Sequence, residues 1–421
     1  MEAVEKLSLF ATQMHLEPAE ESGRSSSIPL HVLPTNQLNQ PNHQSPITNH
    51  PKIAPCGQVV ETGGSGLPIK KDSLGIHPAV TPAGKTMSLL KTMITSACER
   101  NCFYCPFRAG RNFRRATFKT EELAKTFLDM HRAGMADGMF LSSGIIRGGR
   151  TTQDKIIDAA EILRNKYGFR GYLHLKIMPG AEKEQVLRTM QLANRVSVNL
   201  EGANTERLRL LAPQKVFLEE LLEPLKWVEE IRQTKRADTW NGRWPSSVTQ
   251  FVVGAVGESD LELLTTSAYL LNTLKLARTY YSAFSPVVNT PLEENPAEDP
   301  LRQHRLYQAS FLMRDYGFDL EEMPFTADGN LPLTADPKRA WANGHLSDAP
   351  VELNQADRET LLRVPGIGPK SADTIVSARR RGRLKGLSDL KALGLNSSRP
   401  APYVLLDGKR PEFQLPLFDD F

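Results

Sequence analysis

The sequence predicts an α/β fold in which an open, partial (β/α)6 barrel is followed by a small α-helical module. From about residue 87, apolar and β-branched runs alternate with helical patterns, and such alternation implies parallel strands joined by right-handed crossovers. Over residues 351–395 the pattern becomes a helix, a tight glycine turn and a second helix. The composition, with 40% apolar and 24% charged residues, is that of an ordinary globular protein.

The predicted barrel elements follow one another in regular order. The strands are expected at Met87–Thr95, Gly138–Leu141, Tyr172–Met178, Arg195–Leu200, Ser247–Val253 and Thr279–Phe284. The helices are expected at Thr120–Ala133, Thr152–Tyr167, Glu182–Ala193, Leu218–Gln233, Ser259–Leu274 and Leu301–Tyr316. Six units are too few for a closed eight-fold barrel, but they suit an open one, with its chemistry at the C-terminal ends of the strands.

The chain of 421 residues is long enough for two or three domains. We expect a disordered or loosely attached segment at 1–55, the barrel at 56–320 and a linker or covering loop at 321–350. The helical module is expected at 351–400 and a tail at 401–421. No apolar run reaches about 18 residues, and the start lacks a basic, apolar leader, so we expect a cytoplasmic protein without membrane contact. The net charge of +4 indicates no partner by itself.

Three of the four cysteines lie close together, directly after the first predicted strand. Cys98, Cys102 and Cys105 are spaced by four and three residues, and clustered cysteines in a large chain indicate metal or redox chemistry rather than a disulfide framework. Soft thiolates select zinc or iron–sulfur. Zinc would need a fourth ligand, for which the distant Cys56 and His131 are candidates. Three ligands on a cubane cluster would instead leave one iron open to a substrate or cofactor.

The CxxxCxxC spacing, with Tyr104 before the third cysteine and a β/α array after it, resembles the radical S-adenosylmethionine (SAM) enzymes. The resemblance implies a [4Fe–4S] cluster on the three cysteines, with SAM chelated to the fourth iron by its methionine amino and carboxylate groups. Cleavage of SAM to a 5′-deoxyadenosyl radical is the implied activity, with flavodoxin or ferredoxin as an example of the electron donor. Catalytic residues remain unassigned.

The same resemblance implies SAM contacts at the ends of the later strands. Ser142-Ser143-Gly144 lies where the family often has Gly-Gly-Glu, and Lys176 alternates with His174 on the third strand. The implied contacts are Ser142, Ser143, Gly144, Lys176, Asn199, Glu201, Gly254 and Gly257. Each of these strand-end polar residues could instead serve only the fold.

The C-terminal module is similar to the helix–hairpin–helix of DNA repair and recombination proteins. Two glycines flanking one apolar residue permit a tight reversal, and the amides that open the second helix form an anion site. Such a site binds phosphate without reading sequence, and a basic run follows it. The expected nucleic-acid contacts are Gly366, Ile367, Gly368, Lys370, Arg379, Arg380 and Arg381.

The two modules together resemble the bacterial DNA modification/repair radical SAM protein family with a C-terminal helix–hairpin–helix. Matching stretches such as RATFKTEEL, VNLEGANTERL and VPGIGPKSA lie within about residues 85–395. The resemblance implies a radical SAM enzyme that acts on DNA. Two alternatives remain open, an RNA-modifying radical SAM enzyme and a DNA-binding adaptor whose iron–sulfur cluster is structural or redox-sensing.

Two smaller features complete the sequence analysis. The C-terminal Gln414, Leu415, Leu417 and Phe418 are similar to the peptide that docks on the bacterial sliding clamp, with two apolar anchors that would fill a pocket. The tail could equally pack on its own barrel. Cys56 could be an inert thiol, a cluster ligand or a hydrogen donor to a product radical.

Overall fold

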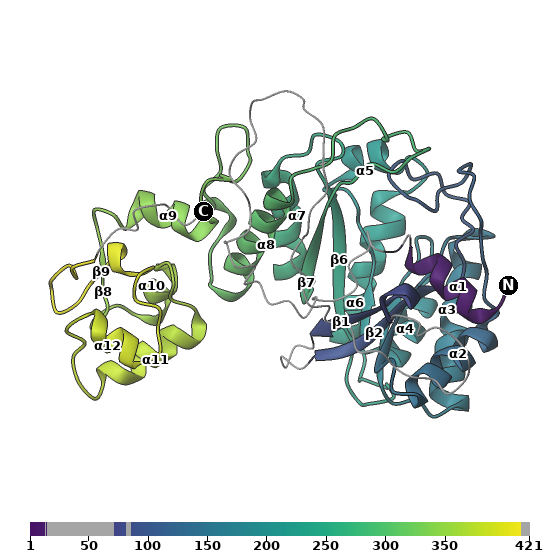
Figure 1. Ribbon diagram of the computed structural model, residues 1–421, viewed down its shortest axis with the longest axis horizontal. Helices are drawn as coiled ribbons and strands as arrows, with labels where there is room; N and C mark the ends of the chain where they lie inside the picture. The colour runs from purple at the N-terminus through teal and green to yellow at the C-terminus, as the bar shows by residue number, and fades with distance from the viewer. Residues whose placement is uncertain (13, 15–70, 81–85, 414–421) are drawn as a thin grey trace, which may run out of the picture.

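The computed structural model describes residues 1–12, 14, 71–80 and 86–413. Figure 1 shows a large α/β lobe and a smaller helical lobe that follows it in the chain. Among the described residues no helix is long and apolar enough to span a bilayer. The predicted combination of a partial barrel with a helical module is confirmed.

The large lobe is built on one curled sheet of seven strands in sequential order. Strand β1 pairs antiparallel with β2, and β2 to β7 are parallel. In register, Lys91, Phe140 and His174 lie side by side on neighbouring strands. The strands are β1 Ile76–Val80, β2 Thr86–Met93, β3 Gly138–Ser142, β4 Tyr172–Lys176, β5 Arg195–Ser197, β6 Ser246–Val253 and β7 Arg278–Ala283. Because the order is linear, the barrel stays open between β1 and β7.

Helices cover the outer face of this sheet (Figure 1). They are α2 Thr120–Arg132, α3 Gly148–Glu161, α4 Lys183–Leu192, α5 Thr205–Leu211, α6 Glu223–Thr234, α7 Asp260–Asn272 and α8 Pro300–Asp315. Two predicted helices contain π-helical segments, at Ile162–Lys166 after α3 and Phe217–Leu222 before α6. Helix α7 begins as its sequence suggests, because the Ser259 hydroxyl accepts a hydrogen bond from the Glu262 amide at 3.2 Å.

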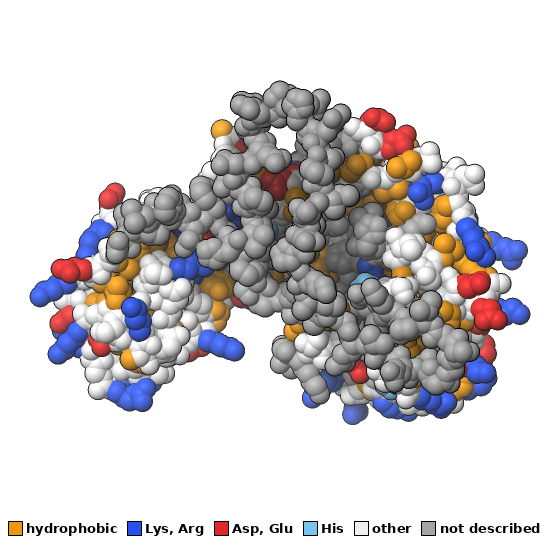
Figure 2. All heavy atoms as spheres, in the orientation of Figure 1, with side chains coloured by type: hydrophobic (Ala, Val, Ile, Leu, Met, Phe, Trp, Pro, Cys, Tyr) orange, Lys and Arg blue, Asp and Glu red, His pale blue; other side chains and the backbone are white. Residues whose placement is uncertain are grey.

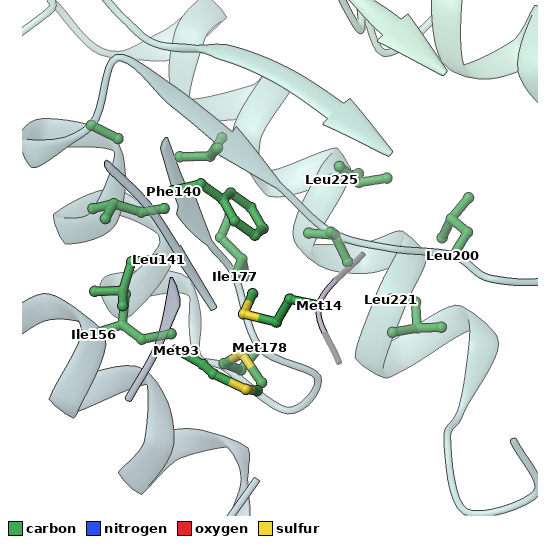
Figure 3. Close-up of a cluster of buried hydrophobic side chains, with 14 of the residues drawn as sticks. Met14, Met93, Phe140, Leu141, Ile156, Ile177, Met178, Leu200, Leu221 and Leu225 are labelled. Atoms are coloured by element: carbon green, nitrogen blue, oxygen red, sulfur yellow. The ribbon is translucent and has the colours of Figure 1, made fainter. Parts of the chain in front are cut away.

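The strands are buried on both faces, as in other parallel sheets covered by helices. Figure 3 shows Met93, Phe140, Ile177 and Met178 directed toward one cluster inside the barrel, with Met14 from the N-terminal region among them. All five side chains are buried. The flexible thioethers of methionine suit this irregular interior, where strands of different length end.

The expectation of a loosely attached N-terminus is wrong for residues 3–11. They form helix α1, Ala3–Ala11, with Phe10 fully buried. The Phe10 ring packs edge-on against Phe118 at 5.9 Å, and Lys6 pairs with Glu122 at 2.7 Å. Nine residues carry only a weak periodic signal, so burial against the barrel rather than helix propensity stabilises this helix. Residues 15–55 lie outside the described residues.

The small lobe has a hydrophobic core of its own. Its elements are α9 Pro337–His345, β8 Val351–Glu352, α10 Arg358–Arg363, α11 Pro369–Arg379, α12 Leu387–Ala392 and β9 Val404–Leu405. The expected linker at 321–350 therefore contains a helix, and Ala342 of α9 is fully buried in the module core. Parallel pairing of β8 with β9 extends the module past the expected end at residue 400.

Candidate functional site

The cysteine loop, residues 94–118, leaves the C-terminal end of β2 and returns to the same place. At its base Ser96 N donates to Ala116 O at 3.0 Å, and Phe118 N donates to Ile94 O at 2.8 Å. Inside the loop, the Arg115 guanidinium donates to four backbone carbonyls at 2.7–3.2 Å. This bracing holds the loop in one shape before any ligand binds.

All three predicted ligands, Cys98, Cys102 and Cys105, are free thiols and line one pocket. The sulfur of Cys98 accepts a hydrogen bond from Ile145 N, and that of Cys105 accepts one from Phe107 N, both at 3.4 Å. Burial raises the pKa of the Cys102 and Cys105 thiols. Because metal coordination deprotonates a thiol outright, these buried sulfurs suit a metal centre better than a reactive thiolate.

The cysteines are not drawn together around a single ion. Among the described residues, no three His, Cys, Asp or Glu side chains are grouped as ligands of one metal. Zinc would hold its sulfurs about 3.8 Å apart, given Zn–S bonds of roughly 2.3 Å, whereas a cubane cluster binds each thiolate at a different iron. His131, the candidate fourth zinc ligand, bonds Ala136 O at 2.8 Å and does not line the cysteine pocket. Three thiols that line one pocket are the donors that iron–sulfur clusters take in proteins, so the residues present fit such a cluster.

The predicted Ser142, Ser143 and Gly144 stretch lines the same pocket. Gly144 N donates to Thr95 O at 2.7 Å. A Cβ atom on Gly144 would lie 2.2 Å from Ala97 O and 3.2 Å from the Cβ of Cys98. A glycine is therefore required here because the end of β3 touches the cysteine loop.

The predicted Lys176, Asn199 and Glu201 also converge on the cysteine pocket, from the ends of β4 and β5. Asn199 donates to the Gln250 side-chain oxygen at 3.2 Å. Glu201 is buried and has a φ of +63°, a left-handed conformation that is uncommon outside glycine. Strained residues of this kind cluster at functional sites.

Lys215 is a pocket residue that the sequence did not reveal. Its ammonium lies 3.2 Å from Glu201, and both side chains are at least nine-tenths buried. Burial opposes the charge, but Cys102 and Glu201 outweigh it and raise the pKa of Lys215. Tyr104 also hydrogen-bonds Glu201. No motif marks Lys215, which reaches the pocket only because α5 turns the chain back after Glu201.

Two predicted SAM contacts do not line the cysteine pocket. Gly254 and Gly257 both have positive φ and shape the turn after β6. Gly254 N donates to Glu258, so this turn is held by its own carboxylate. His174 is a core residue, packed edge-on against Phe140 at 4.7 Å.

A second pocket adjoins the first on the side of β6 and β7. The residues that it shares with the cysteine pocket are Tyr104, Cys105, Phe107, Lys176, Asn199 and Glu201. The remaining lining residues are Met14, Pro106, Gln250, Val252, Ser282, Ala283, Phe284 and Ser285. This pocket has a cavity volume of about 100 Å³ and opens to solvent.

The predicted hairpin joins α10 to α11. Gly366 has a φ of +84° and packs against Arg399 and Pro400, so a Cβ there would meet Arg399 Cβ at 2.8 Å. Ile367 is buried and acts as a plug in the core rather than as a surface contact. Gly368 is the N-cap of α11 and provides no side-chain cap, which leaves the first amides of this helix to an external acceptor.

The arginines of the basic run after the hairpin differ in role: one makes hydrogen bonds within the module, and the others are exposed. Arg379 donates to Leu353 O at 2.9 Å and to Ala356 O at 2.5 Å, so it braces the module. Arg380, Arg381 and Lys370 are exposed. Figure 2 shows Lys and Arg side chains spread over the visible face of this lobe, at the left. Cys56 and the tail residues Gln414, Leu415, Leu417 and Phe418 lie outside the described residues.

Comparison with known families identifies two segments. Residues 92–263 match the radical SAM superfamily, and residues 347–394 match the helix-hairpin-helix motif. The first match covers the cysteine loop and the strands up to β6. The second covers the hairpin and the helices on either side of it. No curated protein matches the chain.

Solved structures are similar to part of this chain at low identity. The FeFe-hydrogenase maturase HydG from Carboxydothermus hydrogenoformans is 15% identical, over 54% of this chain and 51% of its own, with a TM-score of 0.43. Methylornithine synthase PylB is 16% identical, over 54% and 61%, with a TM-score of 0.42. The radical SAM methyltransferase TsrM from Kitasatospora setae is 13% identical, over 52% and 39%, with a TM-score of 0.36. The chain thus spans about half the length of HydG.

Proposed function

Because residues 92–263 form a radical SAM domain and residues 347–394 contain a helix-hairpin-helix motif, we propose that the protein is a radical SAM enzyme that acts on DNA, in modification or repair. Its cofactors are a [4Fe–4S] cluster and SAM. One observation carries the proposal: a pocket lined by three cysteines and a hairpin helix without a side-chain cap occur in one chain.

Cys98, Cys102 and Cys105 would hold the cluster. When bound, the cluster and SAM supply radical chemistry that no amino-acid side chain can supply. Lys215 presents a buried cation suited to a carboxylate, and Glu201 and Asn199 present oxygens suited to an amino or hydroxyl group. Burial of these groups excludes water, which strengthens their electrostatic interactions with a bound zwitterion.

The hairpin supports nucleic acid as the substrate class. The first intrahelical bond of α11 runs from Ala372 N to Gly368 O at 2.8 Å, so the Lys370 and Ser371 amides precede it and can donate to a phosphate. Exposed Arg380 and Arg381 add positive charge near this helix. These contacts reach phosphate only, so RNA is the competing substrate and the experiment includes it.

The test measures 5′-deoxyadenosine from the anaerobically reconstituted full chain with SAM and dithionite. A radical SAM enzyme on DNA should form it, and DNA should stimulate formation more than RNA of the same sequence. Stoichiometric zinc without iron, or iron without any SAM cleavage, would contradict the enzyme and favour an adaptor. Mass spectrometry of DNA nucleosides from wild-type and deletion cells would then identify the product.

Two partners belong to the same proposal. An electron donor such as flavodoxin or ferredoxin would reduce the cluster, because nothing else in the reaction supplies the electron. The C-terminal peptide would dock the enzyme on the bacterial sliding clamp. A pull-down in which a Leu417→Ala, Phe418→Ala variant retains clamp binding would remove the clamp from the proposal.

A further inference from the structure

The cysteine loop is basic and aromatic to a degree that cluster binding does not require. The loop, residues 94–118, contains five arginines and five aromatic residues, and its one carboxylate is that of Glu99. The Glu99 carboxylate accepts hydrogen bonds from the Arg147 and Gly148 amides rather than pairing with an arginine of the loop. Because like charges on one loop repel each other, their presence calls for an anionic partner.

Few of these cations are neutralised within the protein. Arg100 pairs with Glu220 at 2.6 Å. In the part of the chain that the structure describes, the other four arginines of residues 100–119 have no carboxylate within 4 Å. Arg115 is used by the loop itself, through the four carbonyls described above. No carboxylate of the described residues therefore neutralises Arg108, Arg111 or Arg114.

These three arginines differ in how firmly they are held. Arg111 donates to Pro106 O and to Val288 O, each at 2.9 Å. The buried Nε of Arg108 has no hydrogen-bond partner among the described residues, and Arg114 is exposed. A buried donor without an acceptor costs about 1–3 kcal/mol when it stays unsatisfied, so Arg108 is suited to an external acceptor.

Their position follows from the pocket. Tyr104 to Phe107 line the pocket beside β6 and β7, and Arg108 comes next in the chain. Arg111 reaches Val288, which follows β7 and is 68% exposed. The basic stretch therefore lies on the rim of the pocket, between the cysteine loop and the end of β7.

Two carboxylates of the segment after β7, residues 284–299, are engaged within their own part of the chain. Glu298 pairs with Arg302 at 2.6 Å, and Glu293 accepts a hydrogen bond from Asn289 N at 2.6 Å. Neither carboxylate is paired with an arginine of the cysteine loop.

The chemistry of the rim favours a phosphodiester chain. Guanidinium groups bind phosphate through paired donors. The guanidinium carbons of Arg115 and Arg111 lie 4.2 Å and 5.3 Å from the centroid of the Phe113 ring. Arginines alternating with aromatic rings are typical of grooves that bind single-stranded nucleic acid.

We propose that the rim formed by Arg108, Arg111 and Arg114 is a second phosphate-binding surface, which holds a single nucleic-acid strand at the mouth of the barrel. The inference rests on the proposed function and deepens it. Enzymes that modify a base act on single strands or extrude one nucleotide from the stack. The hairpin would anchor the nucleic acid, and the rim would hold the strand whose nucleotide enters the pocket.

The test uses the anaerobically reconstituted full chain and a fluorescein-labelled single-stranded 20-mer, with the matching duplex alongside. The variant is Arg108→Gln, Arg114→Gln, because no hydrogen bond of either side chain braces the loop. The matched control is Arg236→Gln, Arg243→Gln, which removes two exposed arginines between α6 and β6, at the opposite end of the barrel. Binding is measured by anisotropy from 0.05 to 1 M salt.

Each phosphate contact to a single strand contributes about 0.7 to the slope of log K against log salt. The slope of the rim variant should therefore be smaller by about 1.4. When the salt concentration is lowered from 1 M to 0.1 M, the factor by which its affinity increases should be about 25 times smaller than the factor for the wild type. The control should keep the wild-type slope, and the rim variant should lose more affinity for the single strand than for the duplex.

Other outcomes overturn the inference. A rim variant with the slope and affinity of the control removes the second surface, while loss of binding in Lys370→Gln would still support the hairpin. A rim variant that binds DNA normally but is no longer reduced by flavodoxin, although dithionite reduces it, makes the rim a docking site for the electron donor. If the wild type binds neither oligonucleotide, the proposed function itself fails. If the double variant loses iron, the single variant Arg114→Gln replaces it, and its salt slope should fall by half as much, about 0.7.

Discussion

Replacing Arg363 by alanine should release the helical module from the barrel without unfolding either one. Arg363 ends α10, and its guanidinium donates to Tyr316 O at 3.0 Å and to Gly317 O at 2.9 Å, just beyond α8. It also pairs with Glu322 at 2.9 Å and lies 4.0 Å from the Phe318 ring. All four partners follow the barrel's last helix, so one side chain joins the two lobes.

These contacts set the free energy by which Arg363 holds the module against the barrel. Two hydrogen bonds from a charged donor contribute about 1.5 kcal/mol each at the lower end of their range. The Arg363 side chain is 20% exposed and Glu322 is 26% exposed, so the ion pair adds only about 0.5 kcal/mol. The ring contact adds about 0.5–1 kcal/mol. Because water can solvate the freed carbonyls once the lobes part, we expect a net loss of about 2–4 kcal/mol.

Limited proteolysis between residues 323 and 336 measures this loss, because cleavage follows the population of the open form when opening is fast. A loss of 2–4 kcal/mol should raise the cleavage rate about 30- to 700-fold. Arg358→Ala is the matched control on the same helix, since its pair with Asp373 is exposed and lies within the module. Equal cleavage rates for the two variants would refute the reasoning, and unchanged iron content would show that the barrel is intact.

Three further predictions concern the pocket and the module. A Cβ at Gly144 would lie 2.2 Å from the Ala97 carbonyl oxygen in the cysteine loop. Gly144→Ala should therefore lower the free energy of unfolding by about 1–3 kcal/mol and reduce the iron content of the reconstituted protein. The control Gly344→Ala, which has open space around it, should change neither. Lys215→Met should lower the free energy of unfolding, measured with denaturant, by about 3–5 kcal/mol because it leaves the buried Glu201 carboxylate without its partner. Adding Glu201→Gln should restore part of this free energy. A loss below about 1 kcal/mol would contradict the buried pair. Burial lowers the pKa of Lys338 to about 7, whereas the unfolded lysine stays protonated to about pH 10. Since the unfolded chain then binds the extra proton, stability should rise by up to about 2 kcal/mol from pH 7 to 9, and thermal unfolding of Lys338→Met should lack this rise.

The barrel strands, and the placing of three cysteines on one loop at a pocket, could be predicted because their signals are local. The strand at Gly138–Ser142 is apolar throughout, as a doubly buried parallel strand must be. The spacing of Cys98, Cys102 and Cys105 brings three thiols to one loop whatever follows. Gly144 was singled out by the resemblance, and it lies just beyond the strand that the sequence predicts. In each case the pattern and the structure depend on the same few neighbouring residues.

The residues that escaped prediction depend on contacts between distant segments. Lys215 reaches Glu201 only through the path of α5. Arg379 looked like part of a basic face, but the carbonyls of Leu353 and Ala356, more than twenty residues earlier, accept its donors. The sequence did not predict helix α9, because prolines and small polar residues surround it. The helix is stabilised instead by the burial of Ala342 in the module core. Charge and composition cannot distinguish an arginine that braces a fold from one that faces a ligand.

If the rim and the hairpin bind phosphate as proposed, the affinity of the protein for a strand increases because both surfaces belong to one chain. Each surface offers only a few phosphate contacts, and few contacts bind weakly at physiological salt. When one surface is engaged, a rigid connection makes the second contact intramolecular, with an effective concentration that can reach the millimolar range. Arg363, through its bonds to Tyr316 O and Gly317 O, and Lys338, whose ammonium lies 4.6 Å from the Tyr316 ring centroid, hold the module to the barrel side. If both surfaces bind one strand, releasing the module should weaken DNA binding although every phosphate contact is still present.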